Sequence, residues 1–259
     1  MLKGTTREAA AELLGTFLLI CIGVGCVAQN VLSKGANGSY FGINLAFGLG
    51  AMLGVYAAAG VSGAHLNPAV TIALAVHRRL PWSKVAPYVT AQTLGAFLGA
   101  VVVFLTYREA FHMFDGGTRL CEGATATAGI FATYPQPFLS LTGGCIDQIV
   151  GTALLMVGVL AVTDQRNAAP PAWLVAPLVG ALVVAIGLAF GFNAGYAINP
   201  ARDFGPRLFT ALAGWGNGVF TASGGWWWVP IVGPIVGACL GVSVYDLLVG
   251  KHHAGKPIA

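Results

Sequence analysis

The sequence predicts an all-α membrane protein with six transmembrane helices and two re-entrant half-helices, arranged as an inverted repeat. Three observations predict this fold class. The 259-residue chain is 56% hydrophobic and only 8% charged, whereas a soluble domain carries roughly a quarter charged residues. Its uncharged runs approach or exceed the about 20 residues that cross a bilayer as a helix. The tripeptide Asn-Pro-Ala occurs twice, at 67–69 and 199–201, in matching surroundings.

Six runs without a charged residue predict the six spans. They are Leu13–Gln29, Phe41–Gly63, Val85–Tyr107, Ile149–Val162, Trp173–Ile198 and Trp226–Tyr245. The first run has no small-residue cleavage site after a short apolar core. We therefore interpret it as a retained helix and not as a cleaved signal peptide.

The distribution of Lys and Arg predicts the orientation, because six spans place both termini on one side of the membrane. The cations on the side of the termini are Lys3, Arg7, Arg78, Arg79, Lys84, Arg166, Lys251 and Lys256. Those on the other side are Lys34, Arg108, Arg119 and Arg207, with Arg202 at membrane depth. The positive-inside rule therefore predicts cytoplasmic termini, in a plasma membrane or a cell inner membrane. A net charge of +4, scattered in this way, does not indicate nucleic-acid binding.

The chain contains one internal repeat, with halves at about 8–107 and 145–249. Each half holds three spans, with an Asn-Pro-Ala segment between the second and the third. Because three is odd, the second half crosses the membrane in the opposite sense, and such inverted repeats place a pathway at their interface. We predict a single transmembrane channel domain over 1–259, whose halves are joined by an extracellular loop at 108–144.

Each Asn-Pro-Ala segment predicts a short helix that begins at the centre of the membrane. Asn favours the N-cap and Pro the first helical position. Asn67 to His77 is about 11 residues, or roughly 16 Å, which is about half of a 30 Å hydrocarbon core. Non-helical backbone at this depth must be buried in protein or line a wet cavity. We expect a pore lined by the carbonyls of Gly63, Ala64, His65, Leu66, Gly195, Tyr196, Ala197 and Ile198. A single copy would fit an ordinary capped helix better, but two copies in inverted halves favour the pore.

The stretches SGAHLNPAVT (62–71) and GYAINPARDFGP (195–206) resemble the paired signature motifs of the aquaporin, or major intrinsic protein, family. The resemblance covers about residues 8–250 and includes both half-repeats in order. Asp203, directly after Asn-Pro-Ala-Arg, is similar to the glycerol-conducting branch, the aquaglyceroporins or glycerol facilitators. So are the stretches FATYP (131–135), RLFTALAGWG (207–216) and WWWVPIV (226–232). The resemblance implies the aquaporin-like right-handed bundle and a homotetramer with one pore in each subunit.

The resemblance also implies a selectivity filter of four residues at the narrowest point of the pore. They are Phe47, Gly187, Tyr196 and Arg202. These residue types suit a polyol, because Arg202 offers several fixed donors and keeps its proton. Phe47 and Tyr196 would supply an apolar corner, and Gly187 would leave room. A three-carbon polyol would then pass in single file, with its hydroxyls on the polar wall.

The same parts would exclude ions. The paired motifs are Asn67, Pro68, Ala69, Asn199, Pro200 and Ala201. Two helix N-termini at the centre would each carry roughly half a positive charge, which repels cations, hydronium included. Asn67 and Asn199 would cap with their carbonyls and point their amide donors into the pore, which would interrupt a proton-conducting chain of waters. We predict a passive, bidirectional channel in a lipid bilayer for glycerol, other small uncharged solutes and water, closed to protons and ions.

Three polar residues are predicted to support the loops. Glu12 would bond the backbone of a re-entrant loop, although it could also indicate a proton relay. Gln148 holds the matching place in the second half, with Asp147 beside it. Asp203 would orient its loop or bond Arg207. No catalytic group, metal site or cofactor is predicted, and the five cysteines indicate no disulfide framework. Tyr134 and Trp226–Trp228 are interpreted as aromatic residues of the membrane interface.

Other functions remain as alternatives at this point. A coupled secondary transporter would need an ion-coupling acid in its pathway, whereas Glu12 lies in a helix and Asp203 is matched to Arg202. An intramembrane enzyme would need a Ser–His pair, a carboxylate pair or His-Glu-x-x-His at membrane depth, and the sequence contains none there. A water-selective pore is the alternative within the channel class, and Gly187 and Asp203 argue against it.

Overall fold

The structure, a computed structural model, describes residues 2–253, so Lys256 lies outside the described residues. Within them, six helices are long and apolar enough to cross a membrane, which confirms the predicted spans. They are α1 (Gly4–Leu32), α2 (Tyr40–Ser62), α4 (Val85–Thr106), α6 (Leu141–Thr163), α7 (Ala172–Ala194) and α10 (Val229–Leu248). The fifth span ends at Ala194 and not at Ile198, because Gly195 takes a left-handed conformation with φ 70° and turns the chain inward.

Both Asn-Pro-Ala segments begin short helices, as predicted. α3 spans Pro68–Val76 and α8 spans Pro200–Thr210. The side chain of Asn67 accepts a hydrogen bond from the Ala69 N–H, and that of Asn199 accepts from the N–H groups of Ala201 and Arg202. These are N-caps, in which a side-chain oxygen satisfies an N–H without a partner inside the helix. The nine residues of α3 give a length of about 13 Å.

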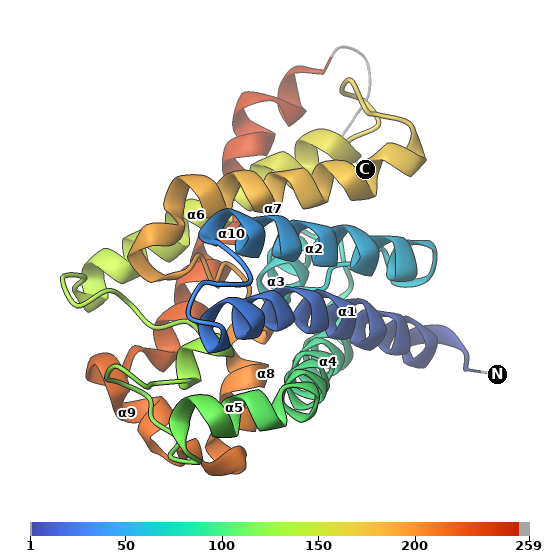
Figure 1. The fold of residues 1–259 in the computed structure, drawn as a ribbon. Coiled ribbons are helices and arrows are strands. Elements are labelled where there is room, and N and C mark those ends of the chain that lie inside the picture. The colour runs from blue at the N-terminus through green and yellow to red at the C-terminus, as the bar shows by residue number, and fades with distance from the viewer. Residues whose placement is uncertain (1, 254–259) are drawn as a thin grey trace.

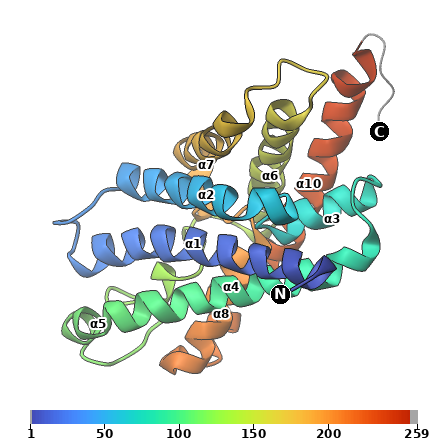
Figure 2. The same ribbon diagram turned by 90° about the vertical axis from the view of Figure 1, so that its right-hand side faces the viewer.

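The long helices form two groups that correspond to the two halves of the sequence. Figure 2 shows α1, α2 and α4 running roughly alongside one another, and α6 alongside α10. In the first group α1 contacts both α2 and α4, and in the second α6 contacts both α7 and α10. α2 also contacts α7, which joins the groups (Figure 1). Each half-helix packs against the last long helix of the other half, α3 against α10 and α8 against α4. The centre of the molecule is therefore built by both halves together.

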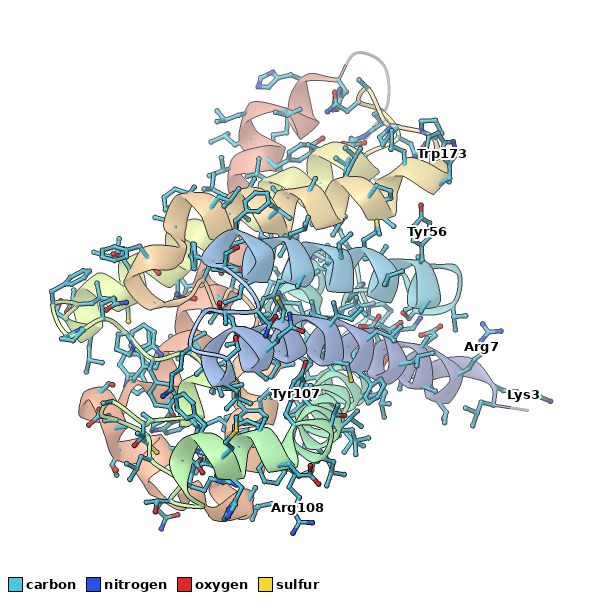
Figure 3. The ribbon with its side chains drawn as sticks, in the orientation of Figure 1. Lys3, Arg7, Tyr56, Tyr107, Arg108 and Trp173 are labelled. Carbon is cyan, nitrogen blue, oxygen red and sulfur yellow. The ribbon has the colours of Figure 1, made fainter. Side chains whose placement is uncertain are left out.

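The polar ends of the helices separate the two sides of the bundle. Figure 3 shows Lys3 and Arg7 at the N-terminal end of α1, on the same side of the molecule as Tyr56 and Trp173. The Tyr56 hydroxyl donates a hydrogen bond of 2.5 Å to the Trp173 carbonyl and ties the end of α2 to the start of α7. Arg108 lies away from that end, at the start of the next helix after α4 (Figure 3).

The connection between α6 and α7 carries its own ion pair. Arg166 Nη2 lies 2.7 Å from Asp164 Oδ2. The Arg166 guanidinium beside Asp164 holds the pKa of that carboxyl well below its usual range. Because the pKa is lowered, the ion pair stabilises the folded protein fully above the ordinary Asp pKa of about 3.9. This stabilisation is lost only as the pH falls below that value toward the lowered pKa. This connection is therefore charged at neutral pH.

The predicted loop at 108–144 contains structure that the sequence analysis did not predict. It begins with α5 (Arg108–Asp115), and a short 3-10 turn at Ala128–Ile130 leads into the FATYP stretch. After α8, a π-helical turn at Ala211–Trp215 and α9 (Gly218–Gly225) lead to α10. The Arg119 guanidinium pairs with Asp115 and lies over three aromatic rings, which fastens the loop to the bundle. These rings belong to Phe104, Phe111 and Trp215.

The prediction of an interfacial role is wrong for Trp226. Its side chain is 1% exposed, and its indole N–H donates to Thr133 Oγ1 at 3.4 Å. Tyr134 also turns inward, with the Arg207 guanidinium 4.7 Å from the centre of its ring. Trp227 and Trp228 are each 36% exposed. The neighbouring tryptophans therefore differ in environment because a 3-10 turn directs them differently.

Glycines allow the helices of each half to approach closely, as small residues do in membrane proteins. A Cβ atom on Gly95 of α4 would collide with the Leu13 carbonyl oxygen of α1. One on Gly237 of α10 would collide in the same way with the Ile149 carbonyl oxygen of α6. The two halves thus use equivalent contacts within one subunit.

Gly95→Ala should therefore destabilise the protein by about 1–3 kcal/mol, the usual cost of overpacking. The matched control is Gly60→Ala in α2, where a Cβ would meet nothing within 4 Å. That change should be neutral or slightly stabilising, since Ala favours a helix more than Gly does. Thermal unfolding of the purified variants in detergent measures both effects. Equal midpoints for the two variants would contradict the packing role of Gly95.

Candidate functional site

A cavity of about 130 Å³ lies where the two halves meet. The re-entrant segments, residues 63–67 and 195–199, contribute backbone and polar groups to its lining. The long helices contribute mainly aliphatic side chains, among them Leu19, Val55, Val159 and Val183. Of the eight residues predicted to present carbonyls, seven line this cavity, and Gly195 is not among its lining residues. The cavity thus combines a polar surface with an apolar one.

The re-entrant segments hold an unusual backbone. Ala64 and Leu66 have φ of 53° and 52°, and Tyr196 and Ile198 have φ of 36° and 42°. Left-handed backbone at residues other than glycine costs of order 1–3 kcal/mol each and persists only where the surroundings enforce it. Ile198 is the most unfavourable of the four because it is β-branched. The surrounding hydrogen bonds must therefore hold these segments in place.

Glu12 of α1 holds the first segment. This side chain is fully buried. Its carboxylate accepts hydrogen bonds from Ser62 Oγ (2.5 Å), His65 N–H (2.9 Å), Leu66 N–H (2.7 Å) and Gln92 Nε2 (2.8 Å). The N–H and C=O of one trans peptide point in opposite directions. Because Glu12 draws two N–H groups outward, the carbonyls of Ala64 and His65 turn toward the cavity.

Gln148 of α6 holds the second segment with fewer bonds. Its Oε1 accepts from the Ile198 N–H at 3.0 Å, and its Nε2 donates to Asp147 Oδ2 at 2.9 Å. By the same peptide geometry, the Ala197 carbonyl turns toward the cavity. One backbone N–H is held here, where Glu12 holds two. The halves are therefore similar in position but unequal in chemistry.

The two motif asparagines join the halves at the centre. Asn67 Nδ2 donates to the Ile198 carbonyl at 2.8 Å, and Asn199 Nδ2 donates to the Leu66 carbonyl at 2.8 Å. The expectation that both amides point into the pore is therefore only partly right. Each amide has two donor hydrogens, and one of them is used between the halves. One remains for the cavity, which both side chains line.

Arg202 lies at the cavity with little exposure, 8%. Its Nη1 donates to the Phe131 carbonyl at 2.8 Å, and its guanidinium lies 4.6 Å from the centre of the Phe47 ring. The Phe131 ring in turn stacks on Phe111. The Arg202 guanidinium is thus held by the loop carbonyl and lies over an aromatic ring, and the residue lines the cavity.

Asp203 pairs with Arg207, which is one of the two roles predicted for it from the sequence, and not with its chain neighbour Arg202. Its Oδ1 accepts from Arg207 Nε at 2.8 Å, and its Oδ2 accepts from the N–H and Oγ1 of Thr133 at 2.7 and 2.5 Å. Arg207 also donates to the carbonyls of Thr133 and Val219. Asp203 and Arg207 are both fully buried. Sequence reasoning found the FATYP stretch only as a resemblance and did not identify Thr133 or the Phe131 carbonyl.

Three of the four predicted filter residues meet at the cavity. Phe47 and Tyr196 have ring centres 6.1 Å apart in an edge-to-face arrangement, next to Arg202. Gly187 lies behind them and is not among the residues that line the cavity. A Cβ atom on Gly187 would lie 2.7 Å from Tyr196 Cζ and would overlap Asn44 Oδ1. Gly187 therefore makes room for the Tyr196 ring, which itself faces the cavity.

Glu12→Gln should weaken both folding and transport, because an amide nitrogen would replace an oxygen that accepts two of the four hydrogen bonds, one of them from a backbone N–H. Leaving one buried donor unpaired costs about 1–3 kcal/mol. The matched control is Glu8→Gln, one turn earlier, where the carboxylate bonds Lys84 and Tyr88 near the helix end. A partly exposed pair is worth about 0–1 kcal/mol. Thermal unfolding and solute permeability of the two variants test this, and a larger loss for Glu8→Gln would contradict it.

Within residues 2–253, no three His, Cys, Asp or Glu side chains gather closely enough to hold a metal ion. The family model described as Major intrinsic protein matches residues 2–245. Aquaporin-10 of Homo sapiens is 47% identical over 251 residues, which cover 97% of this chain and 83% of the relative. Aquaglyceroporin-2 of Rhizophagus irregularis is 51% identical over 248 residues, 95% of this chain and 78% of the relative.

A longer relative matches as well. Aquaporin-10 of Milnesium tardigradum is 50% identical over 260 residues, and the chain spans 95% of its own length but 63% of that relative. Among solved structures, the X-ray structure of the aquaglyceroporin from Plasmodium falciparum superposes with a TM-score of 0.86 at 32% sequence identity. That match covers 96% of this chain and 98% of the other. The similarity therefore extends through both halves and the half-helices.

Proposed function

The chain belongs to the major intrinsic protein family, and we propose that it is a passive, bidirectional channel for glycerol, other small uncharged solutes and water. It is an integral membrane protein, and its family comprises channels and not enzymes. The observation that carries the proposal is the cavity between the halves, which has hydrogen-bonding groups from the re-entrant segments and aliphatic side chains from the long helices.

Glycerol suits this two-sided lining. Its hydroxyls can donate to the inward carbonyls of Ala64, His65 and Ala197, and can accept from Arg202 and the motif asparagines. Its carbon-bound hydrogens would face the aliphatic side chains. These contacts offset the loss of hydration, and several weak positions in a row allow the solute to leave again. Phe47, Gly187, Tyr196 and Arg202 form the proposed selectivity filter, with Gly187 acting through the position of Tyr196.

Protons and other cations are excluded by the positive ends of α3 and α8 together with Arg202. Both half-helices begin at the motif asparagines, so their N-terminal partial charges lie at the cavity. The remaining N–H of each asparagine can donate to a water there. A water that accepts from both sides donates outward in both directions, and proton hopping along a chain of waters is interrupted.

Stopped-flow light scattering of proteoliposomes tests the function directly. An inward glycerol gradient should produce rapid reswelling, and an impermeant osmolyte should produce rapid shrinkage through water flux, relative to vesicles without protein. A pH-sensitive dye inside the vesicles should report no added proton flux under an imposed potential. Glycerol uptake that follows an imposed proton or sodium gradient would instead favour a coupled transporter.

We further propose a homotetramer with cytoplasmic termini, in a plasma membrane or a cell inner membrane. The exposed apolar side chains of α2 and α7, such as Leu49, Leu53, Leu188 and Phe192, supply area for contact with another subunit or with lipid. The mass of the detergent-solubilised protein, measured by light scattering with the detergent subtracted, tests the assembly. Labelling of single cysteines at Lys34 and Lys251 from each side of the membrane tests the orientation.

A further inference from the structure

Asp147 is a carboxylate with only neutral hydrogen-bond partners, close to the second re-entrant segment. It is 9% exposed and lies in α6 next to Gln148. Its Oδ2 accepts from Gln148 Nε2 at 2.9 Å, and its Oδ1 accepts from Asn193 Nδ2 at 2.9 Å. Burying a carboxylate without a cation is costly. A neutral residue at this position would avoid that cost, so we expect a role that only a carboxylate can fill.

The role follows from the Gln148 amide, which has a hydrogen-bond donor on one side and an acceptor on the other. A glutamine can present either its oxygen or its nitrogen to a neighbour, whereas an ionised carboxylate only accepts. Because Asp147 only accepts, Gln148 must turn its Nε2 toward Asp147. Its Oε1 then faces the Ile198 N–H, to which it is bonded at 3.0 Å. The reverse orientation would set an NH₂ group against that N–H.

The first half needs no residue to orient its buried side chain. Both oxygens of Glu12 accept, so either face of the carboxylate can hold the backbone N–H groups of His65 and Leu66. The second half divides the task between two residues, one that holds the N–H and one that sets its orientation. The geometry thus accounts for an Asp-Gln pair opposite a single Glu.

We propose that Asp147 is a positioning residue of the channel, which locks the Gln148 amide so that the Ala197 carbonyl points into the pathway. The inference rests on the proposed function and extends it to a residue that does not line the cavity. We call the hydrogen bond from Gln148 Nε2 to Asp147 Oδ2 the lock. When the lock is lost, Gln148 samples both orientations and the Ile198 N–H is released. The peptide of Ala197 and Ile198 can then turn, and glycerol loses an acceptor next to the proposed filter.

Two backgrounds at position 148 test the lock. Asp147→Leu should lower glycerol permeability about tenfold, the factor that one lost hydrogen bond represents. Adding Gln148→Glu should restore it, because a glutamate at 148 accepts on both oxygens and needs no orienting neighbour. Gln148→Glu alone should be harmful, since it sets two carboxylates side by side. The same substitution should therefore impair transport when Asp147 is present and improve it when Asp147→Leu has been made.

Asn193→Leu is the matched control, because it removes the other partner of Asp147 and leaves the lock intact. It should conduct glycerol as the unmodified protein does. In this background Asp147→Asn changes a single atom, yet allows Gln148 either orientation, and should lower glycerol permeability several-fold. This pair of variants keeps the test valid if Asp147→Leu does not fold. The thermal midpoint of every variant is measured alongside its permeability.

The outcomes separate the inference from the function on which it rests. If the unmodified protein does not conduct glycerol, the proposed function fails. If it conducts and Gln148→Glu does not restore the Asp147→Leu variant, the lock is refuted. A loss in Asn193→Leu equal to that in Asp147→Leu would also refute it, since Asp147 would then act by fastening α7. Restoration together with a functional Asn193→Leu variant supports the lock.

Discussion

Gly187→His combined with Tyr196→Ala should lower glycerol permeability by about 100-fold or more, equal to roughly 2.7 kcal/mol of added barrier, while water permeability persists. The Tyr196 ring now occupies the space beside Gly187. Removing the ring gives an imidazole room to extend toward Phe47 and Arg202. The passage would then be narrower and more polar, and it would exclude a three-carbon solute while single waters still pass.

The single substitutions serve as controls for this design. Gly187→His alone forces its Cβ against Tyr196 and Asn44, so we expect poorly folded protein and not a selective pore. In the double variant Asn44 must turn its Oδ1 aside, and this atom makes no hydrogen bond, although Nδ2 donates to the Tyr40 carbonyl at 3.0 Å. Tyr196→Ala alone widens the site and should retain glycerol flux. Proteoliposome swelling in glycerol and shrinkage in an impermeant osmolyte measure both permeabilities. Unchanged glycerol flux in the double variant would contradict the filter assignment.

Features that depend on local rules could be predicted from the sequence. The six spans follow from the absence of charge over enough residues to cross a bilayer, and the starts of α3 and α8 follow from Asn before Pro. Asn67 and Asn199 cap those helices through their own side chains, so a short stretch of sequence contains the necessary information. The left-handed turn at Gly195 is also local, although an uncharged run concealed it.

Features that depend on contacts between distant segments could not be predicted in the same way. The pairing of Asp203 with Arg207 is local, because a helix brings residues four apart together, and the sequence analysis included it. The second partner of Asp203, Thr133, comes from a loop 70 positions away and was not predicted. Trp226 is buried for a similar reason, since the same loop accepts its indole N–H. The proximity of Gly187 to Tyr196 likewise appears only when α7 and the second re-entrant segment are placed together.

The asparagines show how a correct general prediction can miss a particular contact. Their carbonyls cap the half-helices as expected, and the sequence suggested that the amides face the pore. The symmetry of the repeat brings each amide opposite a carbonyl of the other segment, and one donor of each is used there. Such a bond requires both halves, so neither copy of the motif predicts it alone.

Asp203→Leu should cost about 3–5 kcal/mol, the usual effect of removing one partner from a buried ion pair. The Arg207 charge would stay buried, and the Thr133 N–H would lose its acceptor. At about 2–4 °C for each kcal/mol in a chain of this size, the thermal midpoint should fall by roughly 6–20 °C. Because Thr133 lies two residues from the carbonyl that holds Arg202, the protein that still folds should also conduct less glycerol.

Two further variants distinguish the buried charge from a general loss of contacts. Asp203→Leu with Arg207→Met removes more hydrogen bonds, yet should be more stable than Asp203→Leu alone, because no unpaired charge is left inside. Glu122→Leu is the matched control, since this exposed carboxylate also accepts from a backbone N–H, that of Ser223, and an exposed contact contributes little. Thermal unfolding in detergent ranks the three. The prediction would be contradicted if the double variant were the least stable of the three. The hydrogen bonds from Arg207 to the carbonyls of Thr133 and Val219 would then contribute more to stability than the unpaired charge costs.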